Sequence, residues 1–285
     1  MLYKILKGIA LLSFSLVSFG CSEKVNYVVF QAIQWKATPA YTVAKAIENG
    51  NFKKVRDASE TVLLSEEPTY ERNLLMLAIM HHQYDIAAYI VERVGLVNSK
   101  ERYYGTTPLI LACGLQEINL DFIKFLVDNG ADVNLQESGA LAENHHIRQS
   151  PLSAAVQANH LELINYLIQK GSDVNQPYSE SGRTPLTLAL LSKNKVPIAK
   201  TLILAGADID NELYRTIDGK PVYILEALRN IVGASWKYRS QSKDELIKLL
   251  QHRGYDYFNE PVPDWTLKKL QKAHPTDWEN YLNTY

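Results

Sequence analysis

The chain has 285 residues, of which 46% are apolar and 21% charged, with a formal net charge of −1 at pH 7. This apolar share is enough for a continuous core, and the near-neutral charge gives no electrostatic case for nucleic-acid binding, which would need a basic face. Gly-rich phosphate loops and the motifs G-x-S-x-G, H-E-x-x-H and C-x-x-C are missing from the sequence, so we expect neither an enzyme nor a bound cofactor or metal.

The first twenty residues are predicted to be a signal peptide. Lys4 and Lys7 give the segment a positively charged start. An apolar run of about eleven residues follows at 9–19. This run is too short to span a bilayer as a helix, but it fits the core of a signal peptide.

The segment ends in Ser18-Phe19-Gly20-Cys21, with two small residues before a cysteine. It resembles the lipobox of bacterial lipoproteins, in which the cysteine thiol is acylated and becomes the new N-terminus. It departs from that pattern at Ser18, where Leu is preferred, and at Phe19, where a small residue is. The resemblance implies a lipid on Cys21, and Ser22 implies the periplasmic face of the outer membrane. Ordinary cleavage near the same point, giving a soluble periplasmic or secreted protein, is the alternative.

Cysteine use agrees with a lipid anchor. The only other cysteine, Cys113, falls on the apolar face of a predicted helix, where a free thiol behaves as a small hydrophobe. A disulfide from a flexible N-terminus to a buried helix is disfavoured by geometry. Residues 21–38 are then expected to form an anchor and an N-terminal cap, because 23–35 is too apolar for a free tether.

The next segments repeat one pattern, best seen in residues 105–134. Thr107-Pro108 predicts a helix start, since Thr is a good N-cap and Pro suits the first helical position. A second apolar helix is predicted to end at Gly130, which suits a left-handed C-terminal position. Neither helix buries its apolar face alone, so the pattern requires stacked copies.

Copies occur on both sides of this segment. Their matching positions are spaced 34, 43, 34 and 36 residues apart; these positions are Leu74, Pro108, Pro151, Pro185 and Pro221. A period near 33 with T-P-L-x-x-A and G-A-D-V-N resembles the ankyrin repeat family. The resemblance covers roughly residues 40–256 and implies an all-α solenoid of about six helix pairs, with turns or fingers projecting from one edge and atypical ends.

The spacing of 43 residues contains the connection at 135–149, and it is nine residues longer than the basic spacing of 34. This connection contains His145-His146. Long loops tolerate insertion and often carry binding function. We therefore include both histidines among the candidate partner-binding residues, with a metal or pH-sensitive contact as the sharper hypothesis. Surface histidines without a ligand role are the alternative, because adjacent side chains point in different directions.

Tyrosines recur at fixed distances before the repeats. If the fingers stack, these residues form a row along the edge that ankyrin proteins use for partners; they are Tyr70, Tyr103, Tyr104, Tyr178 and Tyr214. Ordinary packing is the alternative, since the chain has 17 tyrosines.

The C-terminal part departs from the pattern. A sixth helix pair is predicted at 223–232 and 242–254, with Ser242 as N-cap and Glu245 closing a capping box. Residues 39–256 then form the repeat domain, and 257–285 form either a cap or a partner-binding arm.

The predicted function is protein binding by a lipid-anchored ankyrin-repeat protein, with another protein as partner and a membrane contact through the lipid only. The partner is hypothesised to be an envelope-active toxin enzyme, masked as by an immunity protein. The alternatives are an envelope scaffold that supports a stress-protective complex, and a weak hydrolase or metal binder that uses the loop at His145-His146.

Overall fold

The computed structural model describes residues 36, 38–59, 74–101, 103–144, 146–191, 195–230, 241–273, 275–276 and 278–279. The expected signal peptide, the proposed lipid attachment site Cys21, and the candidate residues Tyr70 and His145 lie outside these ranges. The chain divides into two compact units, Met1–Leu96 and Val97–Tyr285.

The N-terminal unit contains two helix pairs in its described part. They are α3 (Tyr41–Glu48) with α4 (Phe52–Ala58), and α5 (Leu74–Met80) with α6 (Tyr84–Val94). The first helices α3 and α5 pack together, and so do the second helices α4 and α6. Every residue of α5 from Leu74 to Ile79 is buried. A helix without Thr-Pro at its start is therefore stabilised here by burial of its apolar side chains.

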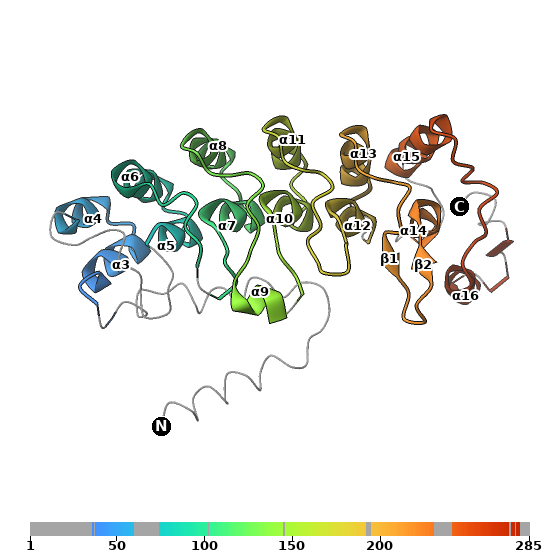
Figure 1. Ribbon diagram of the computed structural model, residues 1–285, viewed down its shortest axis with the longest axis horizontal. Helices are drawn as coiled ribbons and strands as arrows, with labels where there is room; N and C mark the ends of the chain where they lie inside the picture. Colours follow the sequence, from blue (N-terminus) through green and yellow to red (C-terminus); the bar gives the residue numbers. More distant parts are fainter. Residues whose placement is uncertain are drawn as a thin grey trace, which may run out of the picture. The chain divides into compact units, whose positions relative to one another are not determined.

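The C-terminal unit, taken by itself, also consists of paired helices, which lie in two rows (Figure 1). The first-helix row contains α7 (Pro108–Gly114), α10 (Pro151–Ala158), α12 (Pro185–Leu190) and α14 (Ile224–Asn230). The second-helix row contains α8 (Leu120–Asp128), α11 (Leu161–Gln169), α13 (Val196–Leu204) and α15 (Gln241–His252). The described residues thus form six helix pairs, which we number repeats 1 to 6, and the expected all-α solenoid of about six pairs is confirmed.

Local sequence signals set the helix ends as predicted. The Thr107 hydroxyl accepts a hydrogen bond from the Ile110 amide over 3.2 Å, and Pro108 is the first residue of α7. At the end of α8, Gly130 has φ +89°, and the Ala131 amide donates to the Leu126 carbonyl over 3.0 Å. A left-handed glycine with this backward hydrogen bond is the usual way to satisfy the last carbonyls of a helix.

A short β-hairpin replaces the simple turn before repeat 6. Strands β1 (Tyr214–Arg215) and β2 (Pro221–Val222) pair antiparallel, with Tyr214 opposite Val222 and Arg215 opposite Pro221. The Thr187 hydroxyl in α12 donates to the Leu213 carbonyl over 3.1 Å. The hairpin is therefore fixed to repeat 5 as well as leading into repeat 6.

The end of the unit corrects one helix boundary. Helix α15 already includes Gln241, so Ser242 lies inside the helix and is not its N-cap. Glu245 accepts hydrogen bonds from the side chains of Gln241 and Lys200. Beyond α15, helix α16 (Asp264–Ala273) follows.

Candidate functional site

The loop before repeat 3 is held by a buried carboxylate. Glu101 is 2% exposed, and its two oxygens accept from the amides of Tyr103, over 2.9 Å, and Tyr104, over 2.5 Å. The chain then turns at Gly105, whose φ is +69°. This turn leaves the Tyr103 side chain 37% exposed, while that of Tyr104 is half-buried. Tyr103 thus stands on a loop whose shape is fixed by its own hydrogen bonds.

The 135–149 connection docks against this turn and contains the short helix α9 (Ala140–Asn144). The Gly139 amide donates to the Tyr104 carbonyl over 2.9 Å. The approach is so close that a Cβ on Gly139 would lie 2.3 Å from the Tyr103 carbonyl oxygen. Glu137, itself 8% exposed, accepts from the Thr106 hydroxyl over 2.5 Å. The insertion is therefore a packed element of the structure.

The other end of the insertion is fixed to the next finger. The Arg148 amide donates to the Tyr178 carbonyl over 2.7 Å, and Ile147 forms an antiparallel bridge with Ser179. The His146 Nδ1 lies 2.5 Å from a carboxylate oxygen of Glu180. Residues 135–149 consequently join the finger before repeat 3 to the finger before repeat 5.

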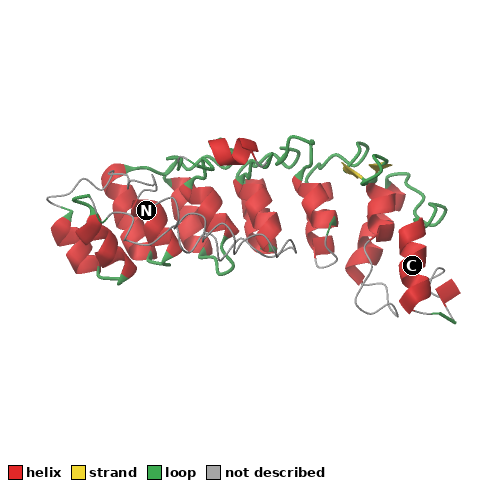
Figure 2. Ribbon diagram, turned by 90° about the horizontal axis from the view of Figure 1, so that it is seen from below, coloured by secondary structure: helices red, strands yellow, loops and turns green. Residues whose placement is uncertain are grey.

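Together these elements form one edge of the C-terminal unit, which we call the finger edge (Figure 2). It consists of the Tyr103 turn at 100–106, the insertion at 135–149, the turn at 176–183 and the hairpin at 213–222. Figure 2 shows α9 and the strands lying on the same side of the helix rows.

The predicted tyrosine row is only partly present. Tyr178 is 6% exposed, and burial raises the pKa of its phenol, so its ring is not presented on the surface as the row requires. It is buried in the turn whose carbonyl accepts from Arg148 in the insertion, a contact between distant residues that local spacing does not reveal. Tyr103 is exposed, whereas Tyr104 and Tyr214 are half-buried.

The hairpin contributes an apolar side chain that the sequence analysis missed. Ile217 is fully exposed at the hairpin tip. The tip is fixed by the Thr216 hydroxyl, which donates to Asp218 over 2.6 Å and accepts from the Lys220 amide over 3.0 Å. The hydrogen bond from the Thr216 hydroxyl is also the main reason why the pKa of Asp218 is lowered. An isoleucine within a polar turn was the available sequence signal.

Charges of both signs surround these apolar side chains. Lys100 donates to the hydroxyl of Ser138 over 2.9 Å, and Arg215 pairs with Glu212 over 2.6 Å. Lys100 thus joins the Tyr103 turn to the insertion, whereas Arg215 pairs locally beside the hairpin. Mixed polar groups around exposed apolar anchors are typical of protein interfaces.

Histidine and metal chemistry gain no support from this geometry. In the described ranges, no group of three or more His, Cys, Asp or Glu side chains is arranged to hold a metal ion. His146 lies beside Glu180. His160 has a structural contact, with its Nε2 2.7 Å from the Leu115 carbonyl oxygen.

The membrane prediction rests on residues that the structure does not describe. Among those that it does, no helix has the length and apolar character needed to cross a bilayer.

Comparisons with known proteins agree with the stacked helix pairs. A family model for ankyrin repeats (3 copies) matches residues 43–137 and 139–212. No curated protein matches the chain. Ankyrin repeats are typically non-catalytic modules that bind other proteins. The family model covers more than half of the sequence, and the chain belongs to the ankyrin-repeat family.

Proposed function

We propose that this protein is a lipid-anchored envelope protein that binds a protein partner through its finger edge. The observation that carries the proposal is the rigidity of that edge, where Tyr103, Ile147 and Ile217 are exposed on loops fixed by hydrogen bonds. A preorganised surface loses little conformational entropy on binding, so more of the contact energy remains as affinity. Tyrosine adds a large contact area with few rotatable bonds.

The hairpin favours a masking role over a scaffold role. A fully exposed Ile217 on a fixed tip suits insertion into a preformed apolar cleft, as in an inhibitor that blocks an enzyme. The proposed partner is therefore a toxic envelope-active enzyme, and this protein acts as its immunity protein. An envelope scaffold uses the same surface but does not require a cleft on the partner.

The binding proposal is tested by pull-down from envelope extract with the mature protein. The test variant carries Tyr103→Ala and Ile217→Ala. The matched control carries Leu161→Ala and Leu204→Ala, two exposed side chains of the second-helix row that are 39% and 60% exposed. Both variants must first show the helical circular dichroism of the parent. We expect the control to retain the partner and the variant with Tyr103→Ala and Ile217→Ala to lose it. The reverse result would refute partner binding at the finger edge.

The role is then decided by the captured partner. An enzyme whose activity falls when the mature protein is added supports masking. A partner whose activity is unchanged supports scaffolding.

The anchor is tested separately by metabolic labelling with a radioactive fatty acid. We expect label in the full-length protein and none in a Cys21→Ser variant. Equal label in both, or none in either, would refute acylation of Cys21 without affecting the binding proposal.

A further inference from the structure

Consecutive loops of the C-terminal unit are joined by a ladder of asparagine side chains. The Asn134 Nδ2 donates to the Gly171 carbonyl over 3.0 Å, and its Oδ1 accepts from the Asp173 amide over 2.8 Å. The same pair of hydrogen bonds joins the other rungs, Asn98 to Gly130 and Asp132, and Asn175 to Gly206 and Asp208. A carboxamide makes both bonds because it carries a donor and an acceptor.

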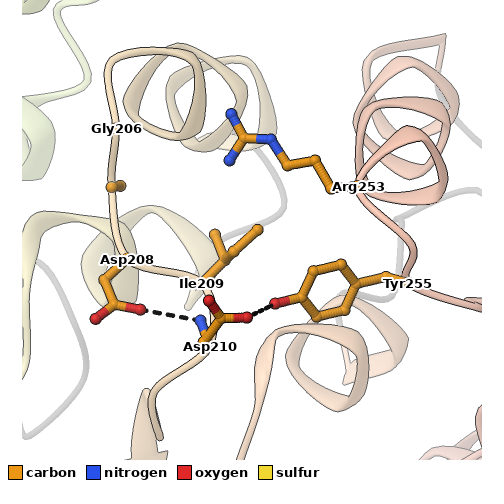
Figure 3. A pocket seen from close by; sticks show the side chains of 7 residues that line it. Gly206, Asp208, Ile209, Asp210, Arg253 and Tyr255 are labelled. Carbon is orange, nitrogen blue, oxygen red and sulfur yellow. Dashed lines mark hydrogen bonds between the residues drawn. The ribbon is translucent and has the colours of Figure 1, made fainter.

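The ladder stops between repeats 5 and 6. Asp210 occupies the position of the ladder asparagines, and an ionised carboxylate only accepts hydrogen bonds. Among the described residues, no hydrogen bond joins its side chain to Gly254 or Asp256, the equivalents of the partners in the regular rungs. Instead the hydroxyl of Tyr255 donates to Asp210 (Figure 3). Tyr255 stands where the earlier loops have Ala131, Ser172 and Ala207.

The main chain at this junction keeps the pattern of the other repeats. Gly254 has φ +90°, and the Tyr255 amide donates to the Leu250 carbonyl over 3.1 Å. After α13, Gly206 has φ +95°, and Ala207 donates to Leu202 over 2.9 Å. The two side-chain changes at positions 210 and 255 therefore account for the missing rung.

An open cavity lies at the same place. Its volume is about 470 Å³, and it is lined by Gly206, Ala207, Asp208, Ile209, Asp210, Arg253 and Tyr255. Figure 3 shows Tyr255 reaching Asp210 from the side of repeat 6, while Arg253 extends above them. The loops at this junction therefore border an open cavity.

The second-helix row carries most of the remaining contact across the junction. Helices α13 and α15 pack together, whereas α12 and α14 pack less closely than α10 and α12 do. Lys200 pairs with Glu245 over 2.7 Å, and Arg253 donates to the Ile203 carbonyl over 3.1 Å. Repeats 5 and 6 are thus joined along the second-helix row and, through the hydrogen bond from Thr187 to Leu213, at the hairpin, whereas the first-helix row contributes little.

Repeat 6 is internally well connected. Arg229 in α14 is 3% exposed, donates to the Tyr257 carbonyl over 2.6 Å and stacks on the Tyr257 ring at 4.3 Å. The Thr266 hydroxyl in α16 donates to the Asn230 side chain over 3.1 Å. Helix α14, the segment at 255–260 and α16 are therefore held as one body.

From these contacts we propose that the junction of repeats 5 and 6 is a built-in hinge. When the junction opens, the C-terminal body separates from repeat 5 and α15 loses its packing on α13; the hydrogen bond from Tyr255 to Asp210 is the latch that closes it. The hinge does not depend on the identity of any partner. It is a property of this junction, because the junctions of repeats 3 with 4 and of repeats 4 with 5 have the asparagine rung and close packing in the first-helix row.

Hydrogen exchange followed by mass spectrometry tests the hinge in the full mature chain. We expect amides of α15 to exchange about tenfold faster than those of α11 and α13, since local opening sets the exchange rate. The variant Asp210→Asn with Tyr255→Ala restores the rung pattern, and we expect it to slow exchange in α15 by roughly fivefold for each regained hydrogen bond. The matched variant Asn175→Asp with Ala207→Tyr transfers the broken pattern to the preceding junction and should accelerate exchange in α13.

A further variant keeps the test decisive if the restored rung does not fold. Tyr255→Phe removes only the latch hydroxyl, and we expect faster exchange in α15 with α11 unchanged. Equal protection of α13 and α15 in the parent protein would overturn the proposal, and so would a folded Tyr255→Phe variant with unchanged exchange in α15.

Discussion

The part of the finger edge at residues 100–183 and the junction of repeats 5 and 6 follow the same main-chain pattern of helix pairs and loops. They differ in the hydrogen bonds that join their neighbouring loops. At the finger edge, the insertion joins neighbouring turns through buried carboxylates and main-chain hydrogen bonds, and asparagine rungs join the loops after the second helices of the same repeats. At the last junction, Asp210 and Tyr255 stand in place of the residues of a regular rung, and a cavity lies beside them. The comparison teaches that the hydrogen bonds between neighbouring loops are set loop by loop, by which side chains carry both a donor and an acceptor.

The largest expected effect comes from disturbing the docked insertion. Gly139→Ala places a Cβ against the Tyr103 carbonyl and the Gly105 amide, at 2.3 and 2.5 Å. Because main chain cannot give way as a flexible side chain does, we expect a loss of about 3 kcal/mol in the free energy of unfolding. Denaturant titration measures it.

Gly114→Ala is the matched control for this change. Its Cβ would meet only the Ala154 side chain at 3.8 Å, and Gly114 is the last residue of α7. We expect no loss, and a gain of up to about 1 kcal/mol, because alanine favours helix more than glycine does. An equal loss in both variants would contradict a specific role for the insertion.

The next effect compares the intact rung with the broken one. Asn134→Ala removes two hydrogen bonds between loops, so we expect a loss of about 2 kcal/mol in the free energy of unfolding. Asp210→Ala removes one hydrogen bond, from Tyr255, and we expect a loss of about 1 kcal/mol. Denaturation curves of the two variants side by side give the comparison. A larger loss at Asp210 than at Asn134 would invert our ranking of the junctions.

Sequence patterns predicted what local chemistry controls. Thr107-Pro108 and Gly130 marked helix ends correctly, because capping and left-handed glycine involve only nearby residues. The repeat period predicted that the helix pairs stack on one another.

Contacts between distant residues were not predictable in this way. Tyr178 is buried in a turn that accepts a hydrogen bond from Arg148, thirty residues earlier in the sequence. Glu245 accepts from Lys200 in another helix as well as from Gln241 at the start of its own helix. Ile217 was missed because its exposure depends on the hairpin that displays it. The sequence shows Asp210 and Tyr255 at the positions of the missing rung. Their effect could be inferred only once the hydrogen bonds of the regular rungs were known.

The smallest expected effect concerns the latch itself. Burial, with help from the hydrogen bond to Asp210, raises the pKa of Tyr255 to about 12, above about 10 for an unperturbed tyrosine. The stability contributed by the neutral phenol is present below about pH 10 and is lost as the pH rises through about 12. Ultraviolet titration of phenolate in the parent minus Tyr255→Phe should therefore show a pKa near 12. A difference curve centred near 10 would mean that the latch is open.

The most direct test of protein binding at the finger edge is site-specific photo-crosslinking in intact cells. A photoreactive amino acid is placed in turn at Tyr103, Ile147 and Ile217, and for comparison at Leu161 and Leu204 on the second-helix row. We predict one crosslinked partner at the three finger positions and none at the two comparison positions. Crosslinks confined to the second-helix row, or no crosslink at any finger position, would contradict the account.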